Sequence, residues 1–249
     1  MNAILASLVF FTRLPFWRIK EVPKEYFKHV VAYWSLSGWL TGGIMALVYW
    51  IAGMVLPVGV AVMLALLSRL LVTGALHEDG LADFFDGFGG GTDRESTLRI
   101  MKDSHIGSYG VLGLIVYYLL AYNLISAFPP AVAPFILLSG DTWSKFVGSN
   151  IINLLPYARK EEESKSKTVY SRLSGKEMTA SALGGILPLF LLPINYWWAC
   201  ILPFVVFLLL YRMMKRRLNG YTGDCCGALF LLCELSFWLD AVLCTNITF

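Results

Sequence analysis

The chain has few charged residues for its size. Of its 249 residues, 15% are charged and 57% are hydrophobic, whereas a typical soluble domain carries about 25% charged residues. This composition excludes an ordinary soluble globular domain. The net charge of +3 gives no indication of nucleic-acid binding, and we expect no nucleic-acid partner.

Cysteine motifs are missing as well. The sequence contains no CxxC spacing, and most of its five cysteines lie in apolar stretches: Cys200, Cys225, Cys226, Cys233 and Cys244. A cysteine in such surroundings serves as a small packing residue more often than as a metal ligand or a disulfide partner. We therefore expect neither a disulfide framework nor a cysteine metal site.

Long uncharged runs dominate the sequence. They cover residues 30–68, 106–140 and 178–211, and each is close to twice the roughly 20 residues that a helix needs to cross a bilayer. Helix-breaking residues lie near the middle of each run, at Gly53 with Pro57, at Pro129-Pro130 and at Pro193. Each run predicts a helical hairpin, because a chain inside a bilayer must satisfy its backbone polar groups internally.

These runs predict an all-α polytopic integral membrane bundle of about seven transmembrane helices. The fourth helix is expected over about residues 131–155 and the last over about 225–243, while residues 1–12 are left open between an inserted and an interfacial segment. No repeat or linker divides the sequence, so we expect one membrane-embedded domain over residues 1–249. The oligomeric state is left open between a monomer and a homo-oligomer.

The positions of lysine and arginine predict the orientation. Eighteen of the twenty lie before residue 30 or within 91–104, 156–177 and 212–217, and the other two are Arg69 and Lys145 inside proposed spans. With seven spans the basic segments all fall on one side, which the positive-inside rule makes cytoplasmic. We therefore expect a multi-pass protein of the cell inner (cytoplasmic) membrane, with its functional site facing the cytoplasm.

The most informative segment is acidic and covers residues 77–87. On a helix Asp79, Asp83 and Asp86 fall at i, i+4 and i+7, so their carboxylates share one face, with Glu78 beside it. Like charges at this spacing each cost about 0.2–0.5 kcal/mol, and the end of the preceding apolar helix favours cations. Such carboxylates suit Mg²⁺, which takes one or two of them with waters and substrate phosphate oxygens. The segment predicts a metal-dependent phosphate site, against the simpler alternative of a solvated acidic face.

A second polar segment follows the glycines at 89–91, which we expect to end the acidic helix. Thr92 and Glu95 are spaced as a capping box, with Thr92 at the N-cap and Glu95 at N3. The helix that they begin is expected to carry Arg99 and Asp103 at i, i+4. Composition leaves two interpretations equal, a phosphate-binding segment and an amphipathic surface helix.

Acidic residues also lie at the entrance of the final span and inside it. Asp224 follows Thr222 at the entrance, and Glu234 lies ten residues deeper. An acid within a span is a functional-site hypothesis, because its charge is costly there. We favour a functional role for Asp224, although Thr222 or Asp224 would also serve as a simple N-cap. Asp141 and Lys145, at i, i+4 in an earlier span, are better explained as a structural ion pair.

The three polar segments together resemble the cobalamin synthase family. The resemblance rests on His77-Glu-Asp-Gly-Leu-Ala-Asp-Phe-Phe-Asp-Gly87, Arg99-Ile-Met-Lys-Asp-Ser-His-Ile-Gly-Ser-Tyr-Gly110, and Gly220-Tyr-Thr-Gly-Asp-Cys-Cys-Gly-Ala228 with Glu234. Residues 11–15 and 156–159 also resemble the family, so the similarity runs in order from residue 11 to residue 234. The pair Cys225-Cys226 departs from the pattern, and residues 141–145 match it less clearly, so no role is carried onto them.

The resemblance implies a membrane-bound adenosylcobinamide-GDP ribazoletransferase of cobalamin biosynthesis. Such an enzyme would join adenosylcobinamide-GDP to α-ribazole or its 5′-phosphate and release GMP, with the lipid bilayer as its surroundings. Attack on a diphosphate needs cations and well-positioned groups around the phosphate oxygens.

The site residues that the resemblance implies fall into three groups. The ligands of Mg²⁺ would be Asp79, Asp83, Asp86 and Asp224. Glu78 would be a further ligand or a base, and Asp103 would bind a second metal ion or orient the basic groups. The groups that bind substrate phosphate would be Arg99, Lys102 and Arg159. Whether one metal ion or two are bound is left open.

Two other classes of membrane protein remain as alternatives. A prenyltransferase or a CDP-alcohol phosphotransferase would also use aspartates and Mg²⁺, but the CDP-alcohol pattern requires Ala-Arg where this chain has Leu81-Ala82. A transporter would use Asp141, Lys145 and Glu234 as an ion path near the bilayer midplane. Most acids of this chain instead cluster at one interface.

Overall fold

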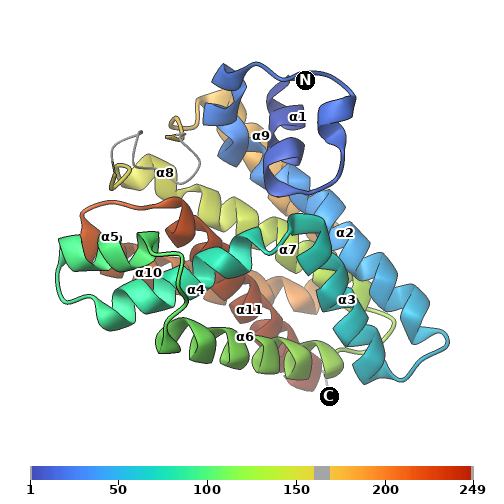
Figure 1. The fold of residues 1–249 in the computed structure, drawn as a ribbon. Coiled ribbons are helices and arrows are strands. Elements are labelled where there is room, and N and C mark those ends of the chain that lie inside the picture. The colour runs from blue at the N-terminus through green and yellow to red at the C-terminus, as the bar shows by residue number, and fades with distance from the viewer. Residues whose placement is uncertain (1, 160–168, 248–249) are drawn as a thin grey trace.

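The computed structural model describes residues 2–159 and 169–247, which form a bundle of helices (Figure 1). Across these two ranges the only extended pairing is an isolated bridge between Tyr157 and Tyr221. The predicted all-α membrane fold is confirmed, since several of the helices are long and apolar enough to cross a bilayer.

The α-helices follow one another with short connections. They are α1 (Asn2–Phe11), α2 (Trp34–Gly53), α3 (Val58–Thr73), α4 (Leu76–Gly90), α5 (Arg94–Lys102), α6 (Ser108–Ser126), α7 (Ala133–Ser149), α8 (Ile151–Leu154), α9 (Gly175–Ile186), α10 (Ile201–Leu218) and α11 (Gly223–Ile247). The 3-10 helices are η1 (Phe16–Arg18), η2 (Lys24–Tyr33), η4 (Leu187–Leu191) and η5 (Ile194–Cys200). Helix α11 runs through the middle of the bundle and packs against α4, α6, α7 and α10 (Figure 1).

The predicted helix breaks are present in the structure. Pro57 is the N-cap of α3, Pro129-Pro130 separates α6 from α7, and Pro193 separates η4 from η5. Proline ends or begins a helix because it lacks an N–H and its ring clashes with the preceding turn. The helix expected over residues 131–155 is shorter than predicted, because α7 ends at Ser149 and the short α8 follows.

Within residues 2–159 and 169–247, four helical segments are long and apolar enough to span a membrane, at 24–53, 108–126, 194–218 and 223–245. The helices α3 and α4 would make a fifth span if taken together, although the chain bends by 91° between them. Helix α7 has 17 residues and α9 has 12, which is shorter than the roughly 20 residues of a full crossing. The count of seven spans and the side on which each loop lies stay predictions.

Helix α2 packs closely on α7 through two glycines. Gly38 and Gly42 are spaced i, i+4 on α2, and a Cβ atom added at Gly42 would lie 2.7 Å from the Cβ of Asp141. Small residues at this spacing let helix backbones approach closely inside a membrane. The contact brings α2 against the polar side chains of α7 in the core.

Candidate active site

The acidic segment begins at a sharp turn between α3 and α4. Gly74 and Ala75 have φ angles of 64° and 59°, in the left-handed region. Glycine adopts this conformation without strain, but alanine does so rarely. The turn starts a new helix at Leu76, so Glu78 and Asp79 lie in its first turn. Our expectation that the helix dipole opposes these acids is therefore wrong, because an acid is stabilised at a helix N-terminus.

The N-terminus of α11 meets the N-terminus of α4. Thr222 caps α11, since its Oγ1 accepts a hydrogen bond from the Cys225 N–H at 3.3 Å. A Cβ atom added at Gly80 would lie 3.1 Å from the Asp224 Cα, and one added at Gly227 would lie 3.0 Å from the His77 carbonyl oxygen. Only glycine permits this approach, which brings Asp79 and Asp224 to one place.

A short extended segment brings Arg159 to the same place. The Ala158 N–H donates to the Tyr221 carbonyl at 2.8 Å, and the Tyr221 N–H donates to the Pro156 carbonyl at 3.0 Å. Arg159 follows this pairing, and its Nη2 donates to the Leu98 carbonyl at 2.9 Å. A guanidinium carries five N–H donors, so this single bond leaves donors for a ligand.

These three elements enclose one cleft. Asp79, Asp224 and Arg159 line it together with aromatic side chains from α1 and the 157–170 region: Phe10, Tyr157 and Tyr170. Asp79 is exposed and Asp224 is buried. Two carboxylates facing an arginine and two helix N-termini can hold a phosphate group together with a cation, because the N-terminal N–H groups and Arg159 attract the anion.

Glu78 and Asp86 lie on α4 but outside this cleft. Glu78 is buried, and its Oε1 lies 3.9 Å from Nη2 of Arg69. Asp86 accepts hydrogen bonds from the backbone N–H groups of Gly107 at 2.7 Å and Gly110 at 2.8 Å, so it stabilises the N-terminus of α6. Asp83 is half-buried one turn beyond Asp79. The acidic residues of α4 therefore lie in different surroundings, although they belong to one helix.

The second polar segment contacts Arg159 through the Leu98 carbonyl, but its predicted phosphate-binding residues do not line the cleft. Arg99, Lys102 and Asp103 are exposed, and none of them lines the cleft. The predicted i, i+4 pairing on one helix is wrong, because α5 ends at Lys102 and Asp103 is its extended C-cap residue. Hydrogen bonds from the backbone and ring of His105 hold the pKa of Asp103 below its usual range.

The predicted capping box is displaced by one residue. Asp93, not Thr92, is the N-cap of α5, and its carboxylate accepts a hydrogen bond from the Ser96 N–H at 2.8 Å. Ser96 completes the box by accepting from the Asp93 N–H at 3.1 Å. Aspartate is at least as good an N-cap as threonine, and the glycines at 89–91 allow the chain to place either residue there.

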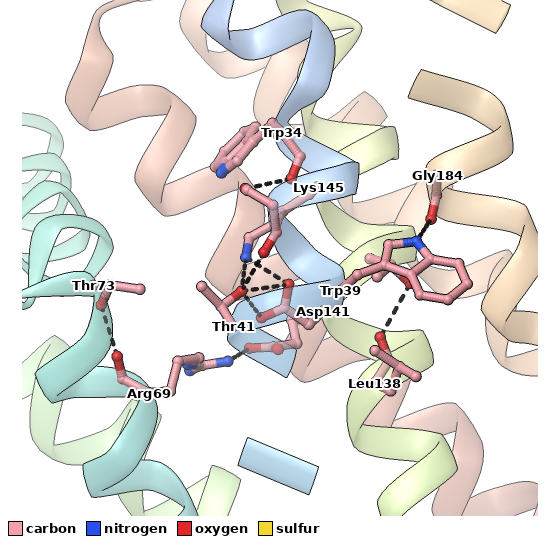
Figure 2. A network of polar contacts seen from close by, with 12 residues as sticks. Trp34, Trp39, Thr41, Arg69, Thr73, Leu138, Asp141, Lys145 and Gly184 are labelled. Carbon is pink, nitrogen blue, oxygen red and sulfur yellow. Dashed lines mark hydrogen bonds and ion pairs between the residues drawn. The ribbon is translucent and has the colours of Figure 1, made fainter. Parts of the chain in front are cut away.

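Buried polar contacts lie in the core beside α4, which they reach through Arg69 and Glu78. The predicted Asp141–Lys145 ion pair is confirmed, whereas the partners of Arg69 were not predicted. Arg69 of α3 pairs with Glu234 of α11 and donates from Nη2 to the Tyr117 hydroxyl at 2.7 Å. Lys145 pairs with Asp141 at 2.5 Å and donates to Thr41 at 2.5 Å, as Figure 2 shows. The signal in the sequence was the position of Arg69 and Lys145 inside proposed spans.

Metal-binding side chains are sparse in the described residues. Within ranges 2–159 and 169–247, no group of three or more histidine, cysteine or acidic side chains is arranged to hold a metal ion. Asp79 and Asp224 are the two carboxylates that share the cleft. Mg²⁺ needs only one or two carboxylates when substrate phosphate and water complete its coordination, so this pair fits a substrate-completed site.

Comparison with known proteins identifies the family of the chain. A family profile described as cobalamin-5-phosphate synthase matches residues 3–243. An adenosylcobinamide-GDP ribazoletransferase of Shewanella sp. (strain W3-18-1) is 38% identical over 246 residues, which cover 96% of this chain and 93% of the relative. The enzyme of the same name from Shewanella baltica (strain OS185) is 37% identical over 254 residues, with 99% and 96% covered. No solved structure matches the chain significantly. The chain therefore belongs to the cobalamin-5-phosphate synthase family.

Proposed function

We propose that this chain is an Mg²⁺-dependent adenosylcobinamide-GDP ribazoletransferase, and that the cleft of Asp79, Asp224 and Arg159 is its active site. The names of its relatives support the activity. The observation that carries the assignment of the site is the meeting of two carboxylates, one arginine and two helix N-termini in one cleft. This is the set of groups that a diphosphate substrate requires.

Asp79 and Asp224 would hold the Mg²⁺ ion. They come from the first turns of separate helices, which the close contacts at Gly80 and Gly227 hold side by side. Mg²⁺ bound there would neutralise charge that develops on the diphosphate oxygens. Asp83, one turn along α4, is the candidate that would extend the ligand set.

The side chains of the cleft would position the diphosphate. Arg159 and the N-termini of α4 and α11 bind its oxygens. A hydroxyl of the ribazole attacks the phosphorus attached to the cobinamide, and the bond from that phosphorus to the bridging oxygen breaks. GMP leaves with the bridging oxygen, and the hydroxyl proton passes to a carboxylate in the cleft. Glu78 faces Arg69. We therefore propose that Glu78 helps to position α4 and does not accept this proton.

The proposal also covers the ribazole acceptor and the side of the membrane on which the cleft lies. The family description names cobalamin-5-phosphate, which is the product that α-ribazole 5′-phosphate would give. Arg159 in the cleft belongs to the basic segment at 156–177, and basic segments favour the cytoplasmic side. We therefore place the cleft at the cytoplasmic face of the inner membrane and name both forms of ribazole as acceptors.

The buried charges favour an enzyme over a transporter. Arg69 of α3 pairs with Glu234 of α11, and Lys145 pairs with Asp141 within α7. An ion path needs groups that exchange partners with a moving ion, whereas these groups hold one another. Their arrangement supports a structural role in keeping the bundle together.

Release of GMP by the purified protein tests the proposal. The protein in lipid nanodiscs would be given adenosylcobinamide-GDP with α-ribazole, with its 5′-phosphate, or with no acceptor, each with and without Mg²⁺. We expect GMP and a cobalamin product only where acceptor and Mg²⁺ are both present. Turnover that is unchanged in Arg159→Gln, in a protein shown to be folded, would remove the cleft from the proposal.

A further inference from the structure

The C-terminal end of α10 contains a basic depression, just before the segment that supplies Asp224. Leu209, Arg212, Met213, Arg216 and Arg217 line it, and its volume is about 530 Å³. All five residues belong to α10, which lies in a segment apolar enough to span the membrane. The depression is therefore at the end of a membrane-spanning helix.

Two of its arginines have no partner among the residues that the structure describes. Arg217 donates to the Gly91 carbonyl, but Arg212 and Arg216 are exposed and form no hydrogen bond or ion pair with any residue that the structure describes. They stand at i, i+4 on one helix face, where like charges repel by about 0.2–0.5 kcal/mol. Helix α10 itself contains no acidic residue. An anion between the two guanidinium groups would relieve this repulsion.

Apolar surface continues directly from the arginines. Leu209 and Met213 are exposed within the depression, and Phe204, Val205 and Leu208 are exposed further along α10. A free phosphate ion gains nothing from such a surface. A molecule with a phosphate at one end and acyl chains at the other matches both parts.

We propose that this depression binds the phosphate headgroup of an anionic phospholipid, with its acyl chains along the exposed face of α10. Arginine suits this ligand, because its planar fork can bind two phosphate oxygens at once. Basic residues beside a spanning helix are a common means of recognising anionic lipid headgroups. The site is separate from the cleft of Asp79 and Asp224.

Lipid titration of the detergent-purified protein, followed by native mass spectrometry, tests the proposal. Phosphatidylglycerol, phosphatidylcholine and inorganic phosphate would be added in parallel arms. We expect phosphatidylglycerol to bind at least ten-fold more tightly than phosphatidylcholine, and the double variant R212Q/R216Q to lose that preference. The matched control is Lys215→Gln, which removes a positive charge from the same helical turn but outside the depression.

Each outcome decides for or against the site. A preference for phosphatidylglycerol that survives in R212Q/R216Q overturns it, as does an equal loss in Lys215→Gln. Competition by inorganic phosphate at the same concentration as the lipid would show a phosphate site and overturn the lipid assignment. If R212Q/R216Q does not fold, R212K/R216K keeps the charge without the planar fork and should bind phosphatidylglycerol more weakly than the wild type.

Discussion

At the scale of single residues, neighbours on α4 have different surroundings. Asp79 lines the cleft, Glu78 faces Arg69 in the core, and Asp86 holds the start of α6. An α-helix turns by about 100° per residue, so adjacent acids point to different neighbours. Charge alone did not distinguish a candidate metal ligand from a residue that supports packing.

The variant Asp79→Asn should therefore show whether Asp79 binds Mg²⁺ or only supports packing. The amide keeps the shape of the carboxylate but removes its charge. We expect kcat to fall by about 10²–10³ and the Mg²⁺ concentration for half-maximal activity to rise. Initial rates of GMP release over a series of Mg²⁺ concentrations measure both.

The control for this prediction is Glu95→Gln, which changes an exposed acid in the first turn of α5. Its rate and Mg²⁺ requirement should equal those of the wild type. Asp83→Asn would show whether the ligand set extends along α4. A normal Mg²⁺ requirement in Asp79→Asn would exclude Asp79 as a ligand.

The buried pair Asp141–Lys145 leads to a prediction about stability. Asp141→Asn leaves the buried Lys145 charge without its partner, which should cost about 3–5 kcal/mol. Adding Lys145→Met removes the unpaired charge, so the double variant should recover much of the loss. Thermal unfolding of both variants in detergent measures this. A double variant less stable than Asp141→Asn would show that Lys145 stabilises the core without Asp141.

At the scale of helices, glycine contacts decide where the site forms. Gly80 and Gly227 allow α4 and α11 to touch at their N-termini, and Gly220 allows the Pro156–Ala158 segment to approach the start of α11. These positions lie far apart in the sequence. Their common effect is to bring Asp79, Arg159 and Asp224 to one cleft.

Gly80→Ala tests the contact between α4 and α11. The new methyl group would lie 3.1 Å from the Asp224 Cα, so the helices must move apart. A contact this short requires a shift of only a few tenths of an ångström, whereas a displacement near 1 Å can cost about 10²-fold in rate. We therefore expect kcat to fall by roughly two- to ten-fold, with overpacking lowering stability by about 1–3 kcal/mol. Enzyme assays and thermal unfolding together measure the two effects.

Gly43→Ala is the matched control for this change. It also replaces a helical glycine, but no atom lies within 4 Å of the added Cβ. Alanine in a helix interior is more favourable than glycine by about 0.5–1 kcal/mol, so this variant should be fully active and slightly more stable. Equal activity in both variants would mean that the α4–α11 spacing does not control the site.

The start of α5 offers a further prediction at this scale. Asp93→Ala removes the observed cap, whereas Thr92→Ala removes the residue that the sequence suggested. Hydrogen exchange of the amides at 94–98 should be several-fold faster in Asp93→Ala and little changed in Thr92→Ala. Equal acceleration in the two variants would show that Asp93 is not the functional cap.

The pH dependence of this cap follows from Asp93. Hydrogen bonds from Ser96 hold the pKa of Asp93 below its usual range. A lowered pKa means that the folded state favours the carboxylate. The cap is therefore fully effective above the unfolded pKa and is lost as the pH falls through the lowered folded value. Exchange at 94–98 should accelerate in acid for the wild type but not for Asp93→Ala.

At the scale of the whole molecule, the basic segments predict the orientation in the membrane. The predicted topology puts the end of α4 in the cytoplasm and the Pro130 region outside. Gly90→Cys and Pro130→Cys, each in a background without the five native cysteines, should differ in labelling by an impermeant maleimide on intact spheroplasts. Only Pro130→Cys should react before lysis. Labelling of Gly90→Cys from outside would contradict the predicted orientation.

The sequence by itself determined the membrane fold, the helix breaks and the segments that supply the site. Uncharged runs and prolines act locally, through backbone hydrogen bonding and ring geometry, so residues 57, 129–130 and 193 could be assigned correctly. The end of α4 at Gly90, beside the glycines at 89–91, was likewise a local property.

Only the tertiary structure decided which of those polar residues share a cleft. Asp79, Arg159 and Asp224 meet because a left-handed turn at 74–75 starts α4 beside α11 and because glycines permit the approach. Arg99, Lys102 and Asp103 remain on an exposed helix end. Contacts between distant segments depend on how all the helices of the bundle pack together. A local pattern of residues therefore cannot predict them.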